Sequence, residues 1–501
     1  MAQTISMPLN RVEGDLEVKV TVHKGIVTEA QVIGTMFRGV ETMLTGRGAL
    51  DGLVITPRVC GICSISHLLA AAMALENMAG SSVSVNSRLV RNLALSTEKL
   101  QSDLRHLFLM FTADLAKKKY QDQALYPEAA QRYQPYRGSA VVATILATRK
   151  LPQIIAILGG QWPHSAFIVP GGVTSRPTQA DLRQCGMLLG EFRRWYEQSI
   201  LGCSIEEVMA IGTCDQFNDW LEKKEAHYNS ELGFFLRCGR AFGLDSLGAG
   251  PDAYLTAPDR IRYQKPETAG GGFLQDGVLT PFDQQAIIEQ VKHARYHERI
   301  CTGHPLVAET HPVEQPADSK YSWCKAPRYA GSPAETGPLA EALIEGDSLC
   351  TDLVASQGAS ALTRELARLL RPARILLNME KWLERIDTSK TFYRPTALPD
   401  DGTGVGLIQA PRGMLGHWVQ LSGGYIDHYQ IITPTTWNAS PRDDRDVPGP
   451  IEQALLGTPV ENPEDPVEVG HVVRSFDPCM VCSVHAVSKN GLSLGRLRIG
   501  T

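Results

Sequence analysis

The strongest constraint on this fold is a pair of Cys-x-x-Cys motifs that lie near opposite ends of the chain. The first is Arg58-Val-Cys-Gly-Ile-Cys-Ser-Ile-Ser-His67, and the second is Asp477-Pro-Cys-Met-Val-Cys-Ser-Val-His485. A Cys-x-x-Cys turn points both sulfurs into one concavity, so two such turns can supply four thiolates to a metal. We expect a site of this kind to tie the two ends of the chain together in one large domain.

Two simpler interpretations are open from the spacing alone, a structural zinc knuckle and a pair of redox-active disulfides. Tetrathiolate zinc usually stabilises one small module, whereas these motifs bracket nearly the whole chain. Both motifs also contain charged or polar residues that a closed structural site does not require, namely Arg58, His67, Asp477 and His485. The pattern therefore favours an active centre, although the spacing does not identify the metal.

The composition is that of a soluble protein with a large buried core. The chain has 501 residues, of which 43% are hydrophobic, and a formal net charge of −5 without any basic block, so nucleic-acid binding is not expected. No signal peptide is visible at the N-terminus, and no segment approaches the ~20 apolar residues of a membrane span. We therefore expect a cytoplasmic location.

The cysteine count argues against a disulfide scaffold, because 11 is an odd number in a chain with no visible export signal. Outside the two motifs, the cysteines are isolated in ordinary surroundings. Since a free cysteine behaves as a small hydrophobe, we interpret these as packing residues: Cys185, Cys203, Cys214, Cys238, Cys301, Cys324 and Cys350.

Hydrophobic periodicity predicts a mainly α fold with a small N-terminal β-sheet, which is an α+β class. Alternating residues predict strands at 16–22 and 26–33, and helical spacing predicts the rest. The predicted helices cover residues 68–78, 90–115, 182–207, 281–299 and 339–383, the last broken near Pro372. The glycine-rich run 402–406 lacks a preceding strand, so it is interpreted as a loop and not as a nucleotide site.

The two cysteine motifs resemble those of nickel–iron hydrogenase large subunits, Arg-x-Cys-Gly-x-Cys-x-x-x-His and Asp-Pro-Cys-x-x-Cys-x-x-His. The resemblance continues, in the family's order, through the segments Arg11-Val-Glu-Gly, Phe37-Arg-Gly-Val-Glu, Gly159-Gly-Gln-Trp-Pro-His, Lys325-Ala-Pro-Arg-Tyr, Ala410-Pro-Arg-Gly and Pro434-Thr-Thr-Trp-Asn. It covers essentially the whole chain from residue 11. The related quinone-site subunit of respiratory complex I lacks the four cysteines, so their presence here favours a hydrogenase.

The resemblance implies a nickel–iron centre held by the four cysteines. Cys60 and Cys479 would be terminal nickel ligands, while Cys63 and Cys482 would bridge nickel and iron. The family's iron also carries cyanide and carbon monoxide, and Pro434 and Thr435 match the residues that face these ligands. His67 is expected to orient a bridging thiolate by a hydrogen bond.

Four further residues match positions that serve catalysis in the family. Arg412 matches an arginine above the metals, where a buried cation compensates anionic ligands; Asp114 and Asp477 match its accompanying carboxylates. The family commonly has Glu before Ala-Pro-Arg, whereas this chain has Gln409. Glu13 matches the glutamate that takes the proton away from a ligating cysteine, a task that needs an exchangeable carboxyl group.

A second metal site and a removable tail are also implied by the resemblance. Glu41, the backbone of Ile431 and His485 match a buried magnesium site, and a carboxylate, a carbonyl and waters suit that hard cation. In the family a maturation protease typically cuts after the last motif histidine. We therefore expect a large-subunit domain at residues 1–485, with a β region at about 1–57 and a helical core at about 58–485, and a removable extension at 486–501.

These features predict reversible heterolytic cleavage of dihydrogen, mainly in the direction of oxidation. No set of cysteines remains for iron–sulfur clusters, because the other seven are scattered singly. A separate iron–sulfur small subunit is therefore expected as partner, together with nickel-insertion factors and the maturation protease. The heterodimer could form a higher oligomer and associate with a membrane through its partners. Asp15, where many relatives have His, favours the cytosolic uptake and hydrogen-sensing branch. The alternatives are a hydrogen sensor that signals to a partner, and a non-catalytic zinc-knuckle scaffold.

Overall fold

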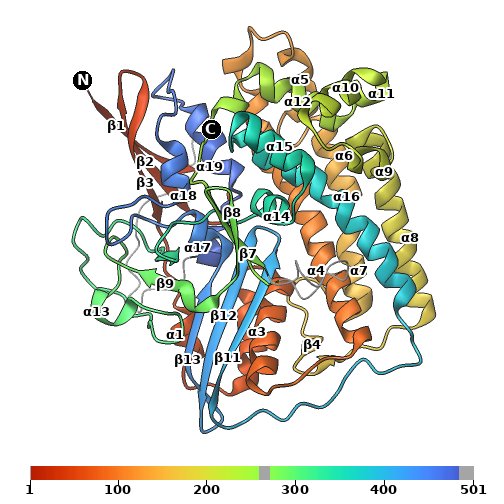
Figure 1. The fold of residues 1–501 in the computed structure, drawn as a ribbon, viewed down its shortest axis with the longest axis vertical. Helices are drawn as coiled ribbons and strands as arrows, with labels where there is room; N and C mark the ends of the chain where they lie inside the picture. Colours follow the sequence, from red (N-terminus) through yellow and green to blue (C-terminus); the bar gives the residue numbers. More distant parts are fainter. Residues whose placement is uncertain (1, 259–270, 484–501) are drawn as a thin grey trace.

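The computed structural model describes residues 2–258 and 271–483, with side chains described up to Val481. Long helices form one side of the molecule, and three antiparallel three-stranded sheets lie along the other side (Figure 1). The fold is thus of the α+β class. The sheets are more extensive than the sequence predicted, because two of the three follow residue 250.

The N-terminal sheet has the order β1-β2-β3 and consists of β1 (Gln3–Leu9), β2 (Leu16–His23) and β3 (Ile26–Gly34). Its alternation is the one the sequence predicted: Leu16, Val18 and Val20 are buried, and the residues between them point toward solvent. A tight turn with positive φ at Lys24 and Gly25 joins β2 to β3. The two predicted strands are confirmed.

The helical side is built around α4 (Val85–Arg105), which contacts α7 (Leu151–Gly159) and α16 (Ala361–Arg385). The remaining helices are α1 (Val40–Leu44), α2 (Gly52–Ile55), α3 (Ser64–Met78), α5 (Tyr126–Tyr133), α6 (Ser139–Thr148), α8 (Gln179–Trp195), α9 (Ile205–Met209), α10 (Cys214–Lys223), α11 (Glu225–Asn229), α12 (Glu231–Ala241), α13 (Glu298–Cys301), α14 (Pro338–Ile344), α15 (Ser348–Gln357), α17 (Pro434–Asn438), α18 (Pro450–Leu455), α19 (Val467–Ser475) and α20 (Met480–Ser483).

The other strands lie in the second half of the chain, apart from one short pair. They are β4 (Ile168–Val169), β5 (Gly172–Val173), β6 (Ala253–Thr256), β7 (Gly272–Gln275), β8 (Val278–Pro281), β9 (Ile287–Gln290), β10 (Ala326–Tyr329), β11 (Gly402–Ala410), β12 (Gly413–Ser422) and β13 (Tyr425–Ile432). The sheet β11-β12-β13 lies against α3, which directly follows the first cysteine motif.

Three predictions about these elements were wrong. Residues 281–299 form β9 and irregular segments, with short helical turns only at Gln284–Ala286 and at the start of α13. The helical region 339–383 is interrupted at Gly346 and Gly358, which have positive φ, while Pro372 lies inside the continuous helix α16. The glycine-rich run 402–406 is the start of β11 and not a loop.

One segment is more apolar than the sequence analysis allowed. Residues Ser139–Gly159 are long and apolar enough to cross a membrane by length and composition, with 39% of the most apolar window buried. In the structure they form α6 and α7, which pack against α4 and α8. A core helix of a soluble protein passes the same test, so this segment alone does not indicate a membrane span.

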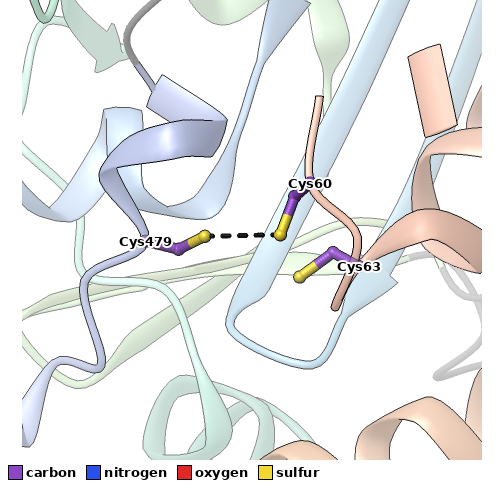
Figure 2. Close-up of side chains that lie close together, drawn as sticks. All are labelled: Cys60, Cys63 and Cys479. Atoms are coloured by element: carbon purple, nitrogen blue, oxygen red, sulfur yellow. Dashed lines mark hydrogen bonds between the residues drawn. The ribbon is translucent and has the colours of Figure 1, made fainter. Parts of the chain in front are cut away.

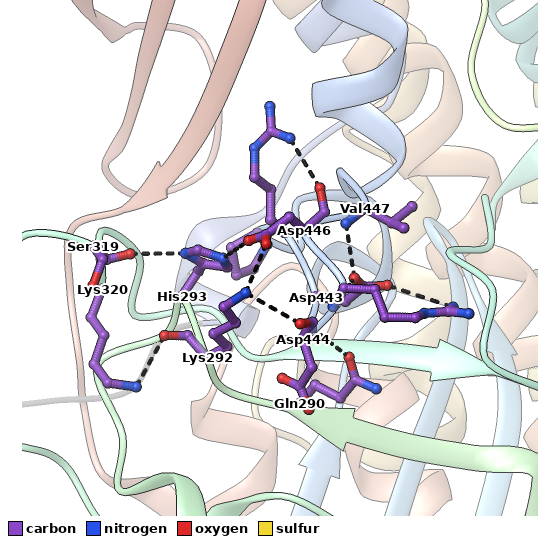
Figure 3. Close-up of polar contacts among 12 residues, drawn as sticks. Gln290, Lys292, His293, Ser319, Lys320, Asp443, Asp444, Asp446 and Val447 are labelled. Carbon is purple, nitrogen blue, oxygen red and sulfur yellow. Dashed lines mark hydrogen bonds and ion pairs between the residues drawn. The ribbon is translucent and has the colours of Figure 1, made fainter.

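The irregular segment between α17 and α18 is fixed to the edge of the β9-β10 pair (Figure 3). Asp446 contacts Lys292 Nζ at 2.7 Å and His293 Nε2 at 2.6 Å, and the backbone N–H of Asp444 donates to Gln290 Oε1. Beneath this surface cluster, fully buried Asp443 pairs with Arg328 of β10. These contacts hold the end of α17, which lies close to the second cysteine motif.

Candidate metal centre

Three cysteine sulfurs from the two ends of the chain meet in the interior (Figure 2). Cys60 and Cys63 lie in the turn before α3, and Cys479 directly precedes α20. The Sγ atoms of Cys60 and Cys479 are 3.6 Å apart, and all three Sγ atoms lie within 4.8 Å of one another. All three residues are at most 5% exposed and form no disulfide. The side chain of Cys482 lies outside the described residues.

The second cysteine motif is held by the segment that contains Glu13. The backbone N–H of Met480 donates to the carbonyl of Glu13 at 2.6 Å, and residues 13 and 479 form a parallel bridge. Gly14 has a φ of 85°, and a Cβ there would lie 2.9 Å from the backbone nitrogen of Val481. Glycine is therefore required at this close approach, which explains the last residue of the Arg-Val-Glu-Gly segment.

Arg412 lies over the sulfurs, in the turn between β11 and β12. Its Nη1 donates to Cys63 Sγ at 3.1 Å, and its Nε lies 3.0 Å from Asp477 Oδ1. Although burial lowers the pKa of this guanidinium, Asp477 and the cysteine sulfurs hold the pKa well above its ordinary value. The site thus contains a buried, permanently charged cation beside the thiols.

Asp477 continues this polar network to a residue that the sequence analysis left unassigned. His106 Nδ1 lies 2.9 Å from Asp477 Oδ1, and His106 Nε2 lies 3.0 Å from Glu365 Oε1. Burial raises the pKa of Asp477, but Arg412 and His106 hold it below its ordinary value. The signal that could have identified His106 is a single histidine in an otherwise apolar helical stretch.

Asp114 does not accompany Arg412, so its predicted position was wrong. It forms an ion pair with Arg474 at 2.6 Å and another with Arg11, in a buried cluster of its own. From the same helical region, Asp103 is connected to the Arg412 turn through Arg371. It pairs with Arg371, whose Nη2 donates to the carbonyl of Pro411 at 2.5 Å.

A small cavity beside the sulfurs is lined by six predicted site residues, Cys63, His67, Arg412, Pro434, Thr435 and Cys479, and by Ser66, Ala410 and Leu415, which were not predicted. Thr435 Oγ1 accepts a hydrogen bond from the backbone N–H of Cys479 at 2.9 Å. The Thr435 hydroxyl proton can therefore point elsewhere, including into the cavity.

The imidazole of His67 belongs to a buried chain of polar groups. Its Nδ1 lies 3.1 Å from His417 Nε2, and His417 Nδ1 lies 2.9 Å from the hydroxyl of Tyr429. This chain fixes the orientation of the His67 ring beside the sulfurs. His417 and Tyr429 lie on β12 and β13, so sequence spacing gave no indication of them.

The structure also brings together Glu41 and the backbone of Ile431, two of the three predicted magnesium ligands. Burial raises the pKa of Glu41, while Lys325 and a hydrogen bond from the Ile431 backbone oppose this shift. Glu289 lies in the same region, 3.5 Å from Lys325 Nζ, and burial raises its pKa to about 7. The third predicted ligand, His485, lies outside the described residues.

Comparison with known proteins identifies the family of this chain. The family model for nickel-dependent hydrogenases matches residues 38–133 and 140–485. The chain belongs to the nickel-dependent hydrogenase family. The periplasmic NiFeSe hydrogenase large subunit of Desulfomicrobium baculatum is 30% identical over 96% of this chain and 94% of its own length. The hydrogenase-2 large chain of Escherichia coli K12 is 27% identical, with 98% of each chain covered.

The same family relationship appears in the solved structures. The reduced Ni-Fe-Se hydrogenase from D. vulgaris Hildenborough superimposes with a TM-score of 0.83 and 28% identity, covering 97% of this chain and 100% of that one. The donors in this hydrogenase chain fit a nickel-containing centre: soft, buried sulfurs that are not joined in a disulfide converge beside a buried cation. A zinc-knuckle scaffold would need neither the cation nor the adjoining cavity.

Proposed function

We propose that this chain is the catalytic large subunit of a nickel–iron hydrogenase and that it cleaves dihydrogen heterolytically, mainly in the direction of oxidation. The observation that carries this proposal is the convergence of Cys60, Cys63 and Cys479 beneath Arg412. The family match over nearly the whole chain supports the same activity.

The centre that we propose contains nickel and iron, held by Cys60, Cys63, Cys479 and Cys482. Cyanide and carbon monoxide on the iron would face the cavity lined by Pro434 and Thr435. When bound, the two metals supply the redox chemistry that splits dihydrogen and accepts its electrons. The protein keeps water away from them, since the three described sulfurs are almost fully buried.

Arg412 and Asp477 would be the charged residues that lie over this centre. A guanidinium fixed by Asp477 and Cys63 holds its positive charge in place before the reaction, so no reorganisation is needed when charge develops. His106 would fix the position of Asp477, which it contacts through Nδ1, and its Nε2 contacts Glu365. This geometry supports the proposed roles of Arg412 and Asp477, whereas Asp114 pairs with Arg474 and Arg11.

Glu13 would carry the proton away from the centre. Burial and the nearby Cys60 sulfur raise the pKa of its carboxyl, and Arg412 opposes this shift. A carboxyl whose pKa is raised toward neutrality exchanges protons more readily in both directions. Its main chain is hydrogen-bonded next to Cys479, which supports the proposal that Glu13 accepts the proton from a ligating cysteine.

We further propose a magnesium ion at Glu41, the backbone of Ile431 and His485, and removal of residues 486–501 by a maturation protease after nickel insertion. The domain would then comprise residues 1–485. A free end at His485 could reach a buried ion, whereas a continuing chain would need an exit path. A mass of the active subunit that corresponds to a chain ending at His485 would support this proposal, and one that includes Thr501 would contradict it.

Relatives named as large subunits indicate that a small subunit is the partner. We propose that this partner holds the iron–sulfur clusters, since the cysteines outside the two motifs are dispersed through the chain. The complex would be cytoplasmic, reach a membrane through other partners if at all, and form higher oligomers of the heterodimer.

The direct test of this function is to replace one predicted ligand. Cys479→Ser should abolish nickel incorporation and dihydrogen-dependent dye reduction, because a serine hydroxyl is a much poorer ligand for nickel than a thiolate. The matched control is Cys185→Ser, which changes a buried cysteine of α8 far from the site. Stoichiometric nickel and normal uptake in the Cys479 variant would refute the ligand assignment.

A further inference from the structure

A second group of side chains with the chemistry of metal ligands lies among the helices α9–α11, which are at the upper right of Figure 1, whereas α3, which follows Cys63, is in the lower part. It consists of Cys203, Glu207 and His227, whose ligand atoms all lie within 4.8 Å of one another. The Nε2 atom of His227 is 3.5 Å from Glu207 Oε1. The sequence analysis interpreted Cys203 as a packing residue, and its distance from both motifs gave no reason to group it with the other two.

His227 is the observation that distinguishes this group from an accidental cluster. Its side chain is fully buried, and its Nε2 has no hydrogen-bond partner. Its Nδ1 lies 2.6 Å from the carbonyl of Trp220, so Nδ1 must carry the proton. The other ring nitrogen, Nε2, lies beside Cys203 and Glu207, and a buried polar atom without a hydrogen-bond partner is costly.

The groups around the His227 imidazole fix its orientation in the same way as the groups around a metal site fix a histidine ligand. A histidine that binds a metal commonly donates its other ring nitrogen to a carbonyl, which fixes the tautomer and the ring orientation. The indole of Trp220 also stacks on the His227 ring, with centroids 4.7 Å apart and an interplanar angle of 13°. The Ser230 hydroxyl donates to the His227 carbonyl at 2.7 Å, fixing the backbone.

The backbone that carries Cys203 is built for a close approach to α11. Gly202 has a φ of 71°, and a Cβ at this position would overlap the carbonyl oxygen of Ala226. Only glycine allows both the left-handed conformation and this contact. This close approach places Cys203 beside His227, which follows Ala226 in the sequence.

We propose that Cys203, Glu207 and His227 form a second metal site that takes one zinc ion, with water as the fourth ligand. A thiolate, an imidazole and a carboxylate are all ligands that zinc accepts in a tetrahedral site. Glu207 is 30% exposed, so the site opens to solvent on one side. Ligand atoms in such a site are separated by roughly 3.3–3.8 Å, so the group needs to contract only slightly.

The competing cation at this site is Lys224. Its Nζ lies 3.1 Å from both carboxylate oxygens of Glu207, and Lys223 Nζ lies at 4.0 Å from the same group. Both lysine side chains are more than half exposed, and exposed ion pairs contribute little stability. A zinc ion can therefore displace Lys224 from Glu207 without disturbing the core.

The test uses the complete enzyme with its nickel–iron centre loaded. After treatment with EDTA, the complex is incubated with Zn²⁺ and desalted, and zinc per large subunit is measured by mass spectrometry. We expect one zinc per large subunit in the unmodified enzyme and none in Cys203→Ser. Glu207→Gln should lower the zinc affinity by more than roughly 10–100-fold, which is the loss expected when a residue that only positions a ligand is replaced. Cys214→Ser and Glu206→Gln, which change neighbouring residues outside the group, should keep the zinc.

A spectroscopic measurement tests the proposed site without relying on the number of zinc ions per large subunit. Co²⁺ in this site should give a thiolate-to-cobalt charge-transfer band that Cys203→Ser lacks and Cys214→Ser retains. Cys203 and Glu207 are partly exposed, so their conservative variants should fold normally. Absence of zinc uptake by the unmodified enzyme, or equal uptake by Cys203→Ser, would overturn the proposal.

Discussion

At the scale of single residues, Arg412 explains how the buried sulfurs and carboxylate can coexist. A buried charge is tolerated when it is paired and hydrogen-bonded. The Arg412 guanidinium contacts Asp477 through Nε and Cys63 through Nη1, so one planar group contacts both a carboxylate and a sulfur. Lysine has a single charged atom and cannot reproduce this two-sided contact.

Arg412→Lys should therefore retain the metals but lose most of its activity. Removal of one preorganised donor typically lowers kcat by ~10²–10³, and we expect dihydrogen uptake to fall by a similar factor. Nickel and iron contents should be normal in the same sample. Arg445→Lys, at an exposed arginine, serves as the control. Uptake within a few-fold of the unmodified enzyme would show that the guanidinium has no special role.

Glu13→Gln tests the proton path at the same scale. The amide keeps the size of the side chain but cannot exchange a proton, and general acid–base groups typically contribute ~10²–10⁴ in rate. We expect hydrogen/deuterium exchange catalysed by the complex to fall by this factor while the metal content is unchanged. Glu29→Gln, on the exposed face of β3, should have no effect. Near-normal exchange in the Glu13 variant would exclude the assigned role.

The sequence was sufficient to place the described sulfurs and Asp477 at the site, and insufficient to place Asp114. Cys60, Cys63 and Cys479 could be predicted to meet because motif spacing fixes which atoms a metal can gather. Asp103 and Asp114 lie in one helical stretch, and neither spacing nor residue type says which arginine each of them pairs with. That choice depends on Arg371 and Arg474, which arrive from distant helices.

At the scale of elements, the contact between β11 and α3 positions the first cysteine motif. Gly404 and Gly406 lie against the backbone of α3, and a Cβ at Gly406 would overlap the carbonyl oxygen of Ala70. The glycine-rich sequence therefore reflects close packing of a strand on a helix. Sequence patterns alone interpret such a run as a loop, because the partner helix lies far away in the chain.

Gly406→Ala should displace α3 and with it Cys63, which directly precedes that helix. Overpacking in a core typically costs ~1–3 kcal/mol, so we expect a lower Tm together with reduced nickel content. The matched control is Gly186→Ala in α8, where an added Cβ meets nothing within 4 Å. The packing argument fails if the Gly406 variant has the Tm and nickel content of the control.

The helices and strands that the sequence predicted correctly are those with local signals. Alternation fixed β2 and β3, and continuous apolar spacing fixed α3 and α4. The helix predicted at residues 281–299 was wrong because the short apolar run of β9 is compatible with either a strand or a helix. Pro372 is accommodated because α16 is buried among other helices, and that tertiary packing has no local signature.

At the scale of the whole molecule, the fold closes a loop of more than four hundred residues at one point. Cys60 and Cys479 are separated by 419 positions, and their sulfurs lie 3.6 Å apart. The strand-like pairing of Glu13 with Cys479 brings the N-terminal segment to the same point. A metal bound there would therefore connect the two ends of the chain, and its loss should loosen both.

The central claim is that these cysteines hold a nickel–iron centre with diatomic ligands. Infrared spectroscopy of the purified complex tests it most directly, because cyanide and carbon monoxide bound to iron absorb where protein does not. We predict cyanide and carbonyl bands that are present in the unmodified enzyme and in Cys185→Ser but absent from Cys479→Ser. A complex with no such bands, carrying zinc at the cysteines in place of nickel and iron, would contradict the claim.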